Sequence, residues 1–273
     1  MTLSLDIGGT NIRSAIVNKT KLADYRKTPT PKKKQDILKK IIEIISQYKK
    51  QTICIAVAGF ERNGVIQHSL NTDINGVALS SLLRKKFKVP VFIENDANCA
   101  GLAELHYGAG KNLNNFVLLT LGTGIGGAVI INKKLYRGNG GAGEIGSIYL
   151  KDKTIFEHLA SGDASVALAH KQGFKNITSL ELEHLANKGN KKAKEVYNKI
   201  GENLGIGLAN ISYILDPDAI LLGGGFSRVK HIYAPAQKAL NKFYNITPKP
   251  KLLKAKFGDD AGLIGAALLS KKQ

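Results

Sequence analysis

The amino-acid sequence predicts an α/β protein built on mixed sheets, and three observations lead to that prediction. Over residues 3–93 the apolar patterns follow the order strand, strand, strand, helix, strand, helix, strand. The second half of the chain again opens with strands around a glycine-rich turn and continues with helices. The composition, with 43% hydrophobic and 22% charged residues in a chain of 273, is that of a globular protein with a sizeable core.

The first half begins with a short antiparallel meander. Leu3, Leu5 and Ile7 alternate with polar positions and predict the first strand. Apolar residues at helical spacing predict one amphipathic helix over about 33–49. The other elements expected in this half are strands at 11–17, 21–25, 53–57 and 90–93 and a helix at about 77–87.

The second half is expected to contain another sheet, followed by helices. Strands at 116–121 and 127–131 flank a glycine-rich turn, and the longest helix is predicted over 191–215. The other elements expected in this half are helices at 179–186, 234–243 and 261–270 and a strand at 219–222, and a helix at 98–107 is expected just before this half begins.

The composition also limits where the protein works. The longest uncharged stretch, 114–132, is interrupted by four glycines, so it is not expected to span a membrane. The first strand begins at Leu3, which predicts that no signal peptide is present. Cys54 and Cys99 are the only cysteines, too few for a disulfide framework or a structural zinc site. We expect a soluble, reduced, cytoplasmic protein without a membrane partner.

The net charge of +19 raises the question of a polyanionic partner. The lysines are spread along the chain, with one dense cluster at residues 32–40. No arginine-rich or aromatic-interleaved basic tract accompanies this cluster, as a nucleic-acid groove would require. The pattern favours a solvated lysine-rich surface, and no nucleic-acid partner is predicted.

The first candidate site is the glycine turn at the exit of the first strand, residues 6–11 (DIGGTN). Gly8 and Gly9 allow the backbone to approach an anion closely, and their amides can bind phosphate oxygens. Thr10 adds a hydroxyl donor, and Asp6 can hold a hydrated magnesium ion. Because paired glycines are common in hairpins, the alternative interpretation is an ordinary turn.

The second candidate is residues 121–127 (LGTGIGG), which repeat the same arrangement after another apolar strand. This is not the dinucleotide-binding fingerprint, because a strand follows the turn instead of a helix. Two matching glycine–threonine turns, one in each half, predict that phosphates are held from both sides of a cleft.

Residues 94–98 (ENDAN) follow a strand and lead into a helix. Asp96 lies near the start of that helix, where one alternative is a plain N-cap role. Phosphoryl transfer, however, needs a carboxylate that accepts the proton of the attacking hydroxyl, and Asp96 is the candidate. Asn95 can hydrogen-bond a neighbouring hydroxyl.

Two further carboxylates and a run of glycines complete the set of candidates. Glu144 and Glu157 suit polyol recognition, since a carboxylate accepts hydrogen bonds from two adjacent hydroxyls. Residues 215–225 contain a strand followed by three glycines, a flat backbone ledge on which an adenine ring can lie. The alternatives are a surface residue for Glu157 and a bare turn for the glycines.

Taken together, these motifs resemble the ROK family (repressors, open reading frames and kinases) of the sugar kinase and actin superfamily. The resemblance covers almost the whole chain. Five motifs match in the family's order and approximate spacing: 6–10, 94–98, 121–127, 215–225 and the closing segment 260–267.

The resemblance implies a fold of two ribonuclease-H-like (actin-like ATPase) domains flanking a hinged cleft. We expect an N-terminal domain at 1–106, with the closing helix at 261–273 packed back on it, and a larger domain at 107–260. The family also implies a homodimer. Its kinases transfer the γ-phosphate of ATP, with Mg²⁺, to a hexose or an N-acylhexosamine.

The resemblance also implies a role for each candidate residue. Asp96 would be the general base. The residues expected to bind the sugar are Asn71, Asn95, Asp96, Glu144 and Glu157. The residues expected to bind the nucleotide are Asp6 (near the magnesium, through water), Gly8, Gly9, Thr10, Asn11, Thr123, Gly124, Gly224 and Gly225.

The chain departs from the family pattern at one place. Most members follow the GEIG element with a histidine and then a zinc-binding CxCGxxGC cluster. Here Ser147 stands at the histidine position, only ten positions before Glu157, and the cysteines are absent. No structural zinc is therefore predicted. The missing histidine usually touches the sugar near its anomeric end or 2-substituent, which leaves the identity of the sugar open.

The functional prediction is an ATP-dependent hexose kinase that acts on the 6-hydroxyl, with glucose as the first choice. The alternative substrates are N-acetylmannosamine, N-acetylglucosamine and fructose, and polyphosphate is an alternative donor because of the basic surface. A second class is a non-catalytic sugar-binding regulator. The DNA-binding repressors of the family carry a further domain before the first phosphate motif, which here starts at Asp6, so that class is not expected.

Overall fold

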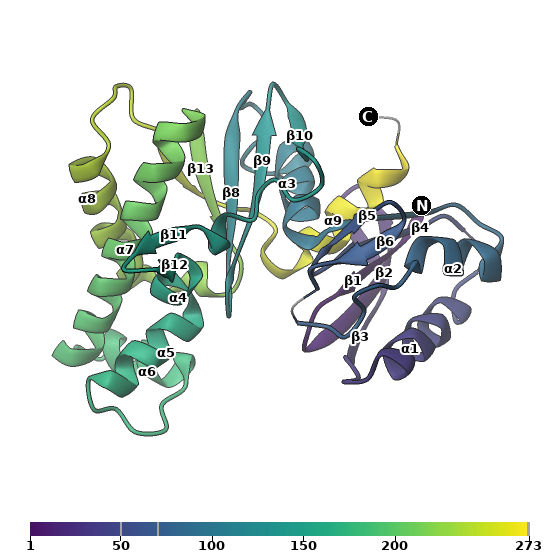
Figure 1. Ribbon diagram of the computed structural model, residues 1–273, viewed down its shortest axis with the longest axis horizontal. Helices are drawn as coiled ribbons and strands as arrows, with labels where there is room; N and C mark the ends of the chain where they lie inside the picture. Colours follow the sequence, from purple (N-terminus) through teal and green to yellow (C-terminus); the bar gives the residue numbers. More distant parts are fainter. Residues whose placement is uncertain (50, 70, 272–273) are drawn as a thin grey trace. The chain divides into compact units, whose positions relative to one another are not determined.

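The computed structural model describes residues 1–49, 51–69 and 71–271. Its contacts divide the chain into two compact units. Unit 1 comprises Met1–Lys111, Leu135–Ala142 and Asp259–Gln273, and unit 2 comprises Asn112–Lys134 and Gly143–Gly258. The chain forms two five-stranded mixed sheets. Figure 1 shows helices packed on the strands, and the predicted α/β class is confirmed.

The sheet of unit 1 has the strand order β3-β2-β1-β4-β7. These strands are β1 (Thr2–Ile7), β2 (Asn11–Asn18), β3 (Lys21–Pro29), β4 (Ile53–Val57) and β7 (Val91–Asn95). The first three form the antiparallel meander that the sequence predicts, whereas β1, β4 and β7 run parallel. Ile7, Val57 and Asn95 are paired across the parallel strands, so the carboxyl ends of these strands lie in one row.

Helices cover both faces of this sheet. On one face, α1 (Lys34–Ser46) and α2 (Leu79–Phe87) share a hydrophobic cluster with the odd-numbered residues of β1. On the other face lie α3 (Asp96–Tyr107), α9 (Ala261–Ala266) and the short helix that continues α9, η5 (Ala267–Ser270). Because side chains alternate along a strand, Asp6 of β1 points to the face of α3 and α9.

The sheet of the second half has the order β10-β9-β8-β13-β14. Its strands are β8 (Phe116–Leu121), β9 (Ile125–Ile131), β10 (Lys134–Tyr136), β13 (Ala219–Gly223) and β14 (Lys251–Lys254). β8 and β9 form an antiparallel hairpin, and β8 runs parallel to β13. The glycine turn at 122–124 joins the two strands of the hairpin.

One hydrophobic cluster joins this sheet to the helices of unit 2. These helices are α4 (Glu157–Ala160), α5 (Gly162–Lys171), α6 (Ser179–Asn187), α7 (Lys191–Leu215) and α8 (Tyr233–Phe243). α7 and α8 lie side by side in Figure 1. Their close approach is seen at Gly205, where a Cβ would lie 2.3 Å from the carbonyl oxygen of Ala236. Glycine at this position therefore sets the distance between the two helices.

Several short elements have no counterpart in the sequence-based prediction. These are the hairpin β5 (Phe60–Arg62) and β6 (Val65–Gln67), the strands β10 and β14, the hairpin β11 (Tyr149–Lys151) and β12 (Thr154–Ile155), and the helix α5. The strands have two to four residues, too few to establish a period of two. No described helix is both long and apolar enough to cross a membrane.

The segment Leu135–Ala142 belongs to unit 1, although the sequence-based boundaries place it in the second domain. Two contacts explain this. Arg137 forms an ion pair with Glu94, and the loop at Gly140 and Gly141 lies against the ring of Phe60.

Candidate active site

The row of strand ends in unit 1 brings the first glycine turn and the segment 94–98 to the same sheet edge. The turn follows Ile7 at the end of β1, and Asp96 follows Asn95 at the end of β7, with only β4 between them. Since neighbouring strands lie about 4.8 Å apart, the two strand ends are about 10 Å apart. Such a row of carboxyl ends is where α/β sheets commonly bind ligands.

The turn at 8–10 is held by hydrogen bonds to its own hairpin and to the residue that follows β3. The Gly8 amide donates to the Asn11 carbonyl at 3.1 Å, and the Thr30 hydroxyl donates to the Gly8 carbonyl at 2.6 Å. A Cβ at Gly9 would lie 2.7 Å from the carbonyl oxygen of Asn71, so only glycine allows the two backbones to approach this closely. The structure therefore brings Asn71, a predicted sugar-binding residue, next to the predicted phosphate turn.

Asp6 lies beneath this turn with 5% of its surface exposed. Its Oδ2 forms an ion pair with Arg13 Nη2 at 2.8 Å, and Arg13 Nη1 donates to the carbonyl of Asp259 at 2.6 Å. Burial raises the pKa of Asp6, and the neighbouring Arg13 charge opposes that rise. A Cβ at Gly262 would lie 2.7 Å from Oδ2, so α9 packs closely on the carboxylate.

Arg13 is not among the residues predicted from the sequence, although a signal was present. Asp6 and Arg13 are direct partners in the register of the β1–β2 hairpin. Because residues paired across a tight hairpin have neighbouring side chains, an acid before the turn and a base after it predict an ion pair. This pair neutralises the charge of Asp6 next to the predicted phosphate turn.

At the start of α3, Asn95 fills the N-cap position and Asp96 is the first helical residue. Asn95 Oδ1 accepts from the Asn98 amide at 3.0 Å, and Asn95 Nδ2 donates to the Gly59 carbonyl at 3.0 Å. The alternative interpretation of Asp96 as a plain N-cap is therefore wrong. Asp96 is half-buried, and its Oδ1 accepts from the Ala97 amide at 2.8 Å. The helix dipole favours a carboxylate at this position.

In unit 2 the turn at 122–124 is bound by the N-terminus of α5. The Gly162 amide donates to the Gly122 carbonyl at 2.8 Å, and the Asp163 amide donates to the Thr123 carbonyl at 3.4 Å. Ser161 caps α5 by accepting from the Ala164 amide. The first amides of α5 thus bind carbonyl oxygens of the turn, while the Thr123 residue itself remains exposed.

Glu157 lies directly against this second turn. Its Oε2 accepts from the Ile125 amide at 3.3 Å, and a Cβ at Gly124 would lie 2.5 Å from the same oxygen. The predicted sugar carboxylate Glu157 is therefore adjacent to the predicted phosphate turn of unit 2.

The segment that carries Glu144 packs on the same hairpin. Cβ atoms at Gly143 (φ +97°) and Gly146 would lie 2.6 Å and 2.1 Å from the carbonyl oxygens of Gly127 and Ile125. Both predicted sugar carboxylates therefore belong to segments that pack against β9 and the turn before it. Glu144 and the neighbouring Ser147 are exposed.

The third glycine motif lies against the end of β8. Gly224 has φ +79°, and a Cβ there would lie 2.3 Å from the carbonyl oxygen of Leu121. A side chain at Gly225 would meet nothing within 4 Å, and this residue is exposed. The structure thus places the predicted adenosine ledge beside the predicted phosphate turn at 122–124.

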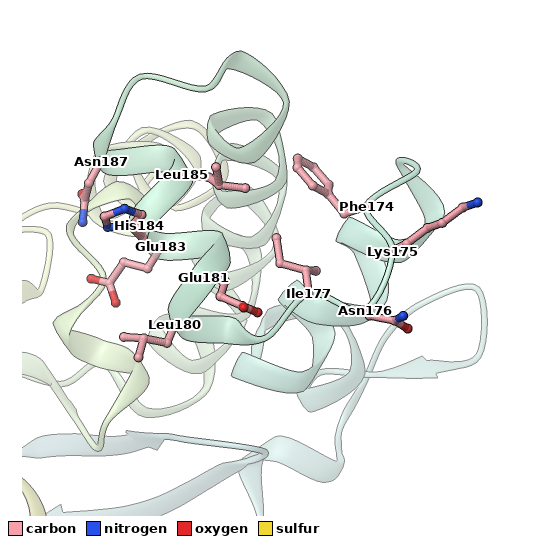
Figure 2. A pocket seen from close by; sticks show the side chains of 10 residues that line it. All are labelled: Phe174, Lys175, Asn176, Ile177, Leu180, Glu181, Glu183, His184, Leu185 and Asn187. Carbon is pink, nitrogen blue, oxygen red and sulfur yellow. The ribbon is translucent and has the colours of Figure 1, made fainter.

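Two other features bear on ligand binding. Among residues 1–49, 51–69 and 71–271, no group of three or more His, Cys, Asp and Glu side chains is arranged to hold a metal ion. A groove of about 890 Å³ lies on α6 and the segment before it. Figure 2 shows the side chains that line it. It is lined by residues between Phe174 and Asn187 and contains none of the predicted site residues.

The fold and the site define the class of protein. Two mixed α/β sheets, each with a glycine turn after a buried strand, are the architecture of the two-domain sugar kinases that this structure matches. The chain belongs to the ROK family, because the family model, described as "ROK family", matches residues 2–273.

Similar proteins cover the chain over almost its whole length. The glucokinase of Streptomyces coelicolor is 29% identical over 310 residues, which cover 100% of this chain and 98% of that protein. The N-acetyl-D-glucosamine kinase of Haemophilus influenzae is also 29% identical and covers 98% of this chain and 99% of its own. Among solved structures, a ROK family glucokinase from Streptomyces griseus in complex with glucose and AMPPNP matches with a TM-score of 0.88 and 27% identity, covering 100% and 99% of the two chains.

Proposed function

We propose that this chain is an ATP-dependent hexose kinase that phosphorylates the 6-hydroxyl of its sugar, with glucose as the first candidate. The observation that carries the proposal is the sheet edge in unit 1, at which the turn at 8–10, Asn71 and Asp96 lie together. Phosphoryl transfer needs a phosphate site and a carboxylate base close to each other. The glucose and ATP analogue bound by the similar Streptomyces griseus glucokinase support this choice of substrates.

In this proposal Asp96 is the general base. Its carboxylate accepts the proton of the 6-hydroxyl while the hydroxyl oxygen forms a bond to the γ-phosphorus, and the bond from that phosphorus to the β–γ bridging oxygen breaks to release ADP. The position at the start of α3 orients the carboxylate and favours its charge, because the Ala97 amide binds one of its oxygens. Asn71, Asn95, Glu144 and Glu157 hold sugar hydroxyls.

The glycine motifs bind the nucleotide. The backbone of Gly8, Gly9, Thr10 and Asn11 and that of Thr123 and Gly124 hold phosphate oxygens, and Gly224 and Gly225 support the adenosine. A magnesium ion, when bound, neutralises charge on the phosphates. Asp6 fits a contact with this ion through water. Its Oδ2 is already bound by Arg13, so the carboxylate has fewer lone pairs left for the ion or for the water molecules around it.

The wider organisation of the protein is also part of the proposal. We propose domains at 1–106 and 107–260, with the helix at 261–273 assigned to the first, although compactness groups the segment Leu135–Ala142 with unit 1. Residues 272 and 273 lie outside the described residues. A homodimer is proposed from the family resemblance, and a cytoplasmic location from the composition. The absence of structural zinc is proposed because the cysteines of the family's zinc-binding cluster are missing from this chain. Sedimentation of the pure protein, with and without a zinc chelator, tests the dimer and the zinc statement together.

An N-acylhexosamine is the second candidate for the sugar. The observation that favours it is the exposed Ser147, which lies three residues after Glu144 at the position of the family histidine. A serine occupies less space than a histidine, so it leaves room near the 2-substituent of a sugar. The Haemophilus influenzae relative, an N-acetyl-D-glucosamine kinase, supports this alternative.

The first experiment is an ADP-release assay with magnesium and ATP against glucose, fructose, N-acetylglucosamine and N-acetylmannosamine. Turnover on one of these sugars supports the proposal and selects the substrate. Binding of ATP without turnover on any sugar would favour the non-catalytic regulator instead. Replacing ATP by polyphosphate in the same assay tests the alternative donor.

The second experiment tests the base. Asp96→Ala is expected to lower kcat by about 10²–10⁴-fold, because general base catalysis contributes that much, while calorimetry should show unchanged ATP binding. Asp36→Ala is the matched control, since Asp36 also lies in the first turn of a helix of unit 1 but on α1. If Asp96→Ala kept most of the activity, the assignment of the base would be wrong.

A further inference from the structure

Glu94 is a buried carboxylate, with 9% of its surface exposed, whose two oxygens both bind protein groups. Oε1 accepts from the Asn95 amide at 2.9 Å and from Asn98 Nδ2 at 3.0 Å. Oε2 binds Arg137 Nε at 2.6 Å. Glu94 therefore connects Arg137 to the residues on both sides of Asp96.

Arg137 comes from a different part of the chain. It directly follows β10, and its carbonyl accepts from the Gly140 amide at 2.8 Å and from the Ala142 amide at 3.3 Å. These two bonds close a tight loop in which Gly138 and Gly140 have positive φ angles. The backbone of Arg137 thus shapes the loop at 137–142, while its side chain reaches the end of β7.

The loop at 137–142 is also fixed on its other side. A Cβ at Gly140 would lie 3.5 Å from the ring of Phe60, and one at Gly141 would lie 3.9 Å from it. Phe60 follows Gly59, whose carbonyl accepts from Asn95 Nδ2 at 3.0 Å. The loop, the segment after β4 and the start of α3 therefore form one hydrogen-bonded and packed assembly within unit 1.

The geometry points to Arg137 as a positioning residue for the phosphoryl transfer: through Glu94, it fixes the backbone and side chains that orient the base, Asp96. This inference rests on the proposed kinase function. The contact that carries it is the bond from Arg137 Nε to the Glu94 carboxylate, because the other oxygen of that carboxylate binds the residue before Asp96 and the residue two positions after it.

The electrostatics explain why an arginine is needed. A buried carboxylate that loses its cation raises the free energy of the folded protein, so the carboxylate moves toward water or another hydrogen-bond donor. In this protein such a movement would withdraw Oε1 from the Asn95 amide and from Asn98, the two groups that frame Asp96. It would also leave an uncompensated negative charge two residues from the base. Both effects disturb catalysis more than nucleotide binding.

The test compares Arg137→Met with Arg84→Met. Arg84 donates from Nε and Nη2 to the carbonyl of Val91, so it binds the opposite end of the same strand, β7. We expect Arg137→Met to lower kcat on the best sugar about 10–100-fold with less than a threefold change in the KM for ATP, in keeping with the cost of unpairing a buried charge. Arg84→Met should leave kcat within about twofold, as expected for a residue remote from the base. Thermal unfolding of both variants shows whether either loses its fold.

A double variant separates positioning from a merely structural role. Glu94→Gln keeps an oxygen that accepts from the Asn95 amide but removes the buried charge that Arg137 neutralises. Arg137→Met should therefore cost at least about fivefold less kcat in the Glu94→Gln background than in the wild type, since residues in one network are not additive. If Arg137 has only a structural role, the fold losses of kcat in Arg137→Met and in Glu94→Gln should multiply in the double variant. If Arg137→Met does not fold, Arg137→Gln replaces it in the same comparison.

The possible outcomes are distinct. An inactive wild-type chain overturns the proposed kinase function, and this inference falls with it. An active wild type whose kcat is unaffected by Arg137→Met overturns the inference alone. Equal losses of kcat in Arg137→Met and Arg84→Met, accompanied by equal losses of thermal stability, also overturn it. Destabilising β7 at either end would then be enough to explain the lower kcat.

Discussion

The two glycine turns have similar sequences. They differ in the group that balances the negative charge of the carboxylate beside each turn. Next to the turn at 8–10, the buried Asp6 is paired with a cation, Arg13. Next to the turn at 122–124, Glu157 has 28% of its side chain exposed, and its Oε2 accepts from a backbone amide, that of Ile125. The Nε2 of His158 lies 3.9 Å from its other oxygen and carries a charge only when protonated. The first carboxylate thus has a permanent cation as its partner, and the second has mainly a backbone dipole.

This difference fits the two carboxylates, Asp6 and Glu157, for different proposed roles. An ion pair with no net charge allows phosphates to approach the first turn without repulsion from Asp6. Glu157 has oxygen acceptors left for hydroxyl groups. Both turns are proposed to bind phosphate, but the carboxylate beside the first is paired with a cation, whereas the carboxylate beside the second keeps acceptors for the proposed sugar hydroxyls. Three changes can test this comparison.

The largest effect is expected from removing the cation of the first turn. Arg13→Met leaves Asp6 buried without its cation, so we expect a loss of about 2–3 kcal/mol in the free energy of unfolding at pH 7, less than for a fully buried pair because Arg13 is partly exposed. ATP binding should weaken as well, since the uncompensated charge repels phosphates. Urea unfolding and calorimetry measure the two effects.

The pH dependence gives this prediction a second readout. Burial raises the pKa of Asp6, and Arg13 lowers it, so the pKa of Asp6 rises further in Arg13→Met. A carboxyl whose pKa is higher in the folded than in the unfolded protein destabilises the fold above the folded pKa, and protonation relieves the penalty as the pH falls through that value. The destabilisation by Arg13→Met should therefore be smaller at pH 5 than at pH 7. Arg26→Met, which breaks the exposed pair with Asp24, is the control and should show no such pH dependence.

A smaller effect is expected from adding a methyl group to each turn. In Gly9→Ala the new Cβ would lie 2.7 Å from the Asn71 carbonyl, so backbone must move, at a cost of about 1–2 kcal/mol. The sugar KM should rise several-fold because Asn71 is displaced. A Cβ at Gly122 meets nothing within 4 Å, so Gly122→Ala should change stability by less than about 0.5 kcal/mol. Equal effects in the two variants would show that the turns are packed alike.

The sequence predicts well those elements whose apolar pattern ends sharply. The strand at 116–121 and the helix at 191–215 have the predicted bounds, because each is an apolar or amphipathic run closed by polar or glycine residues. The strand at 53–57 also has the predicted bounds, with a polar residue before it and Ala58 and Gly59 after it. The helix expected at 98–107 instead begins at Asp96, since the Asn95 side chain caps it. Capping by one side chain changes a boundary without changing the apolar pattern.

Within the candidate site, contacts between neighbouring strands could be predicted from the sequence, whereas contacts between distant segments could not. The ion pair of Asp6 and Arg13 could be derived from hairpin register, because both residues lie on adjacent strands joined by a tight turn. The pair of Glu94 and Arg137 spans 43 positions, and Asn71 reaches Gly9 from a distant part of the chain. No local periodicity encodes such contacts. They depend on how separate segments pack, which only the three-dimensional structure shows.

The smallest effect on stability is expected from neutralising the carboxylate of the second turn. In Glu157→Gln the side-chain oxygen still accepts from the Ile125 amide, so the free energy of unfolding should change by less than about 1 kcal/mol. If Glu157 binds sugar hydroxyls, the charge-assisted bonds become neutral ones and the sugar KM should rise about 3–10-fold, with the KM for ATP unchanged. If instead the KM for ATP fell, Glu157 would act on the phosphates, and the contrast between the two turns would not hold.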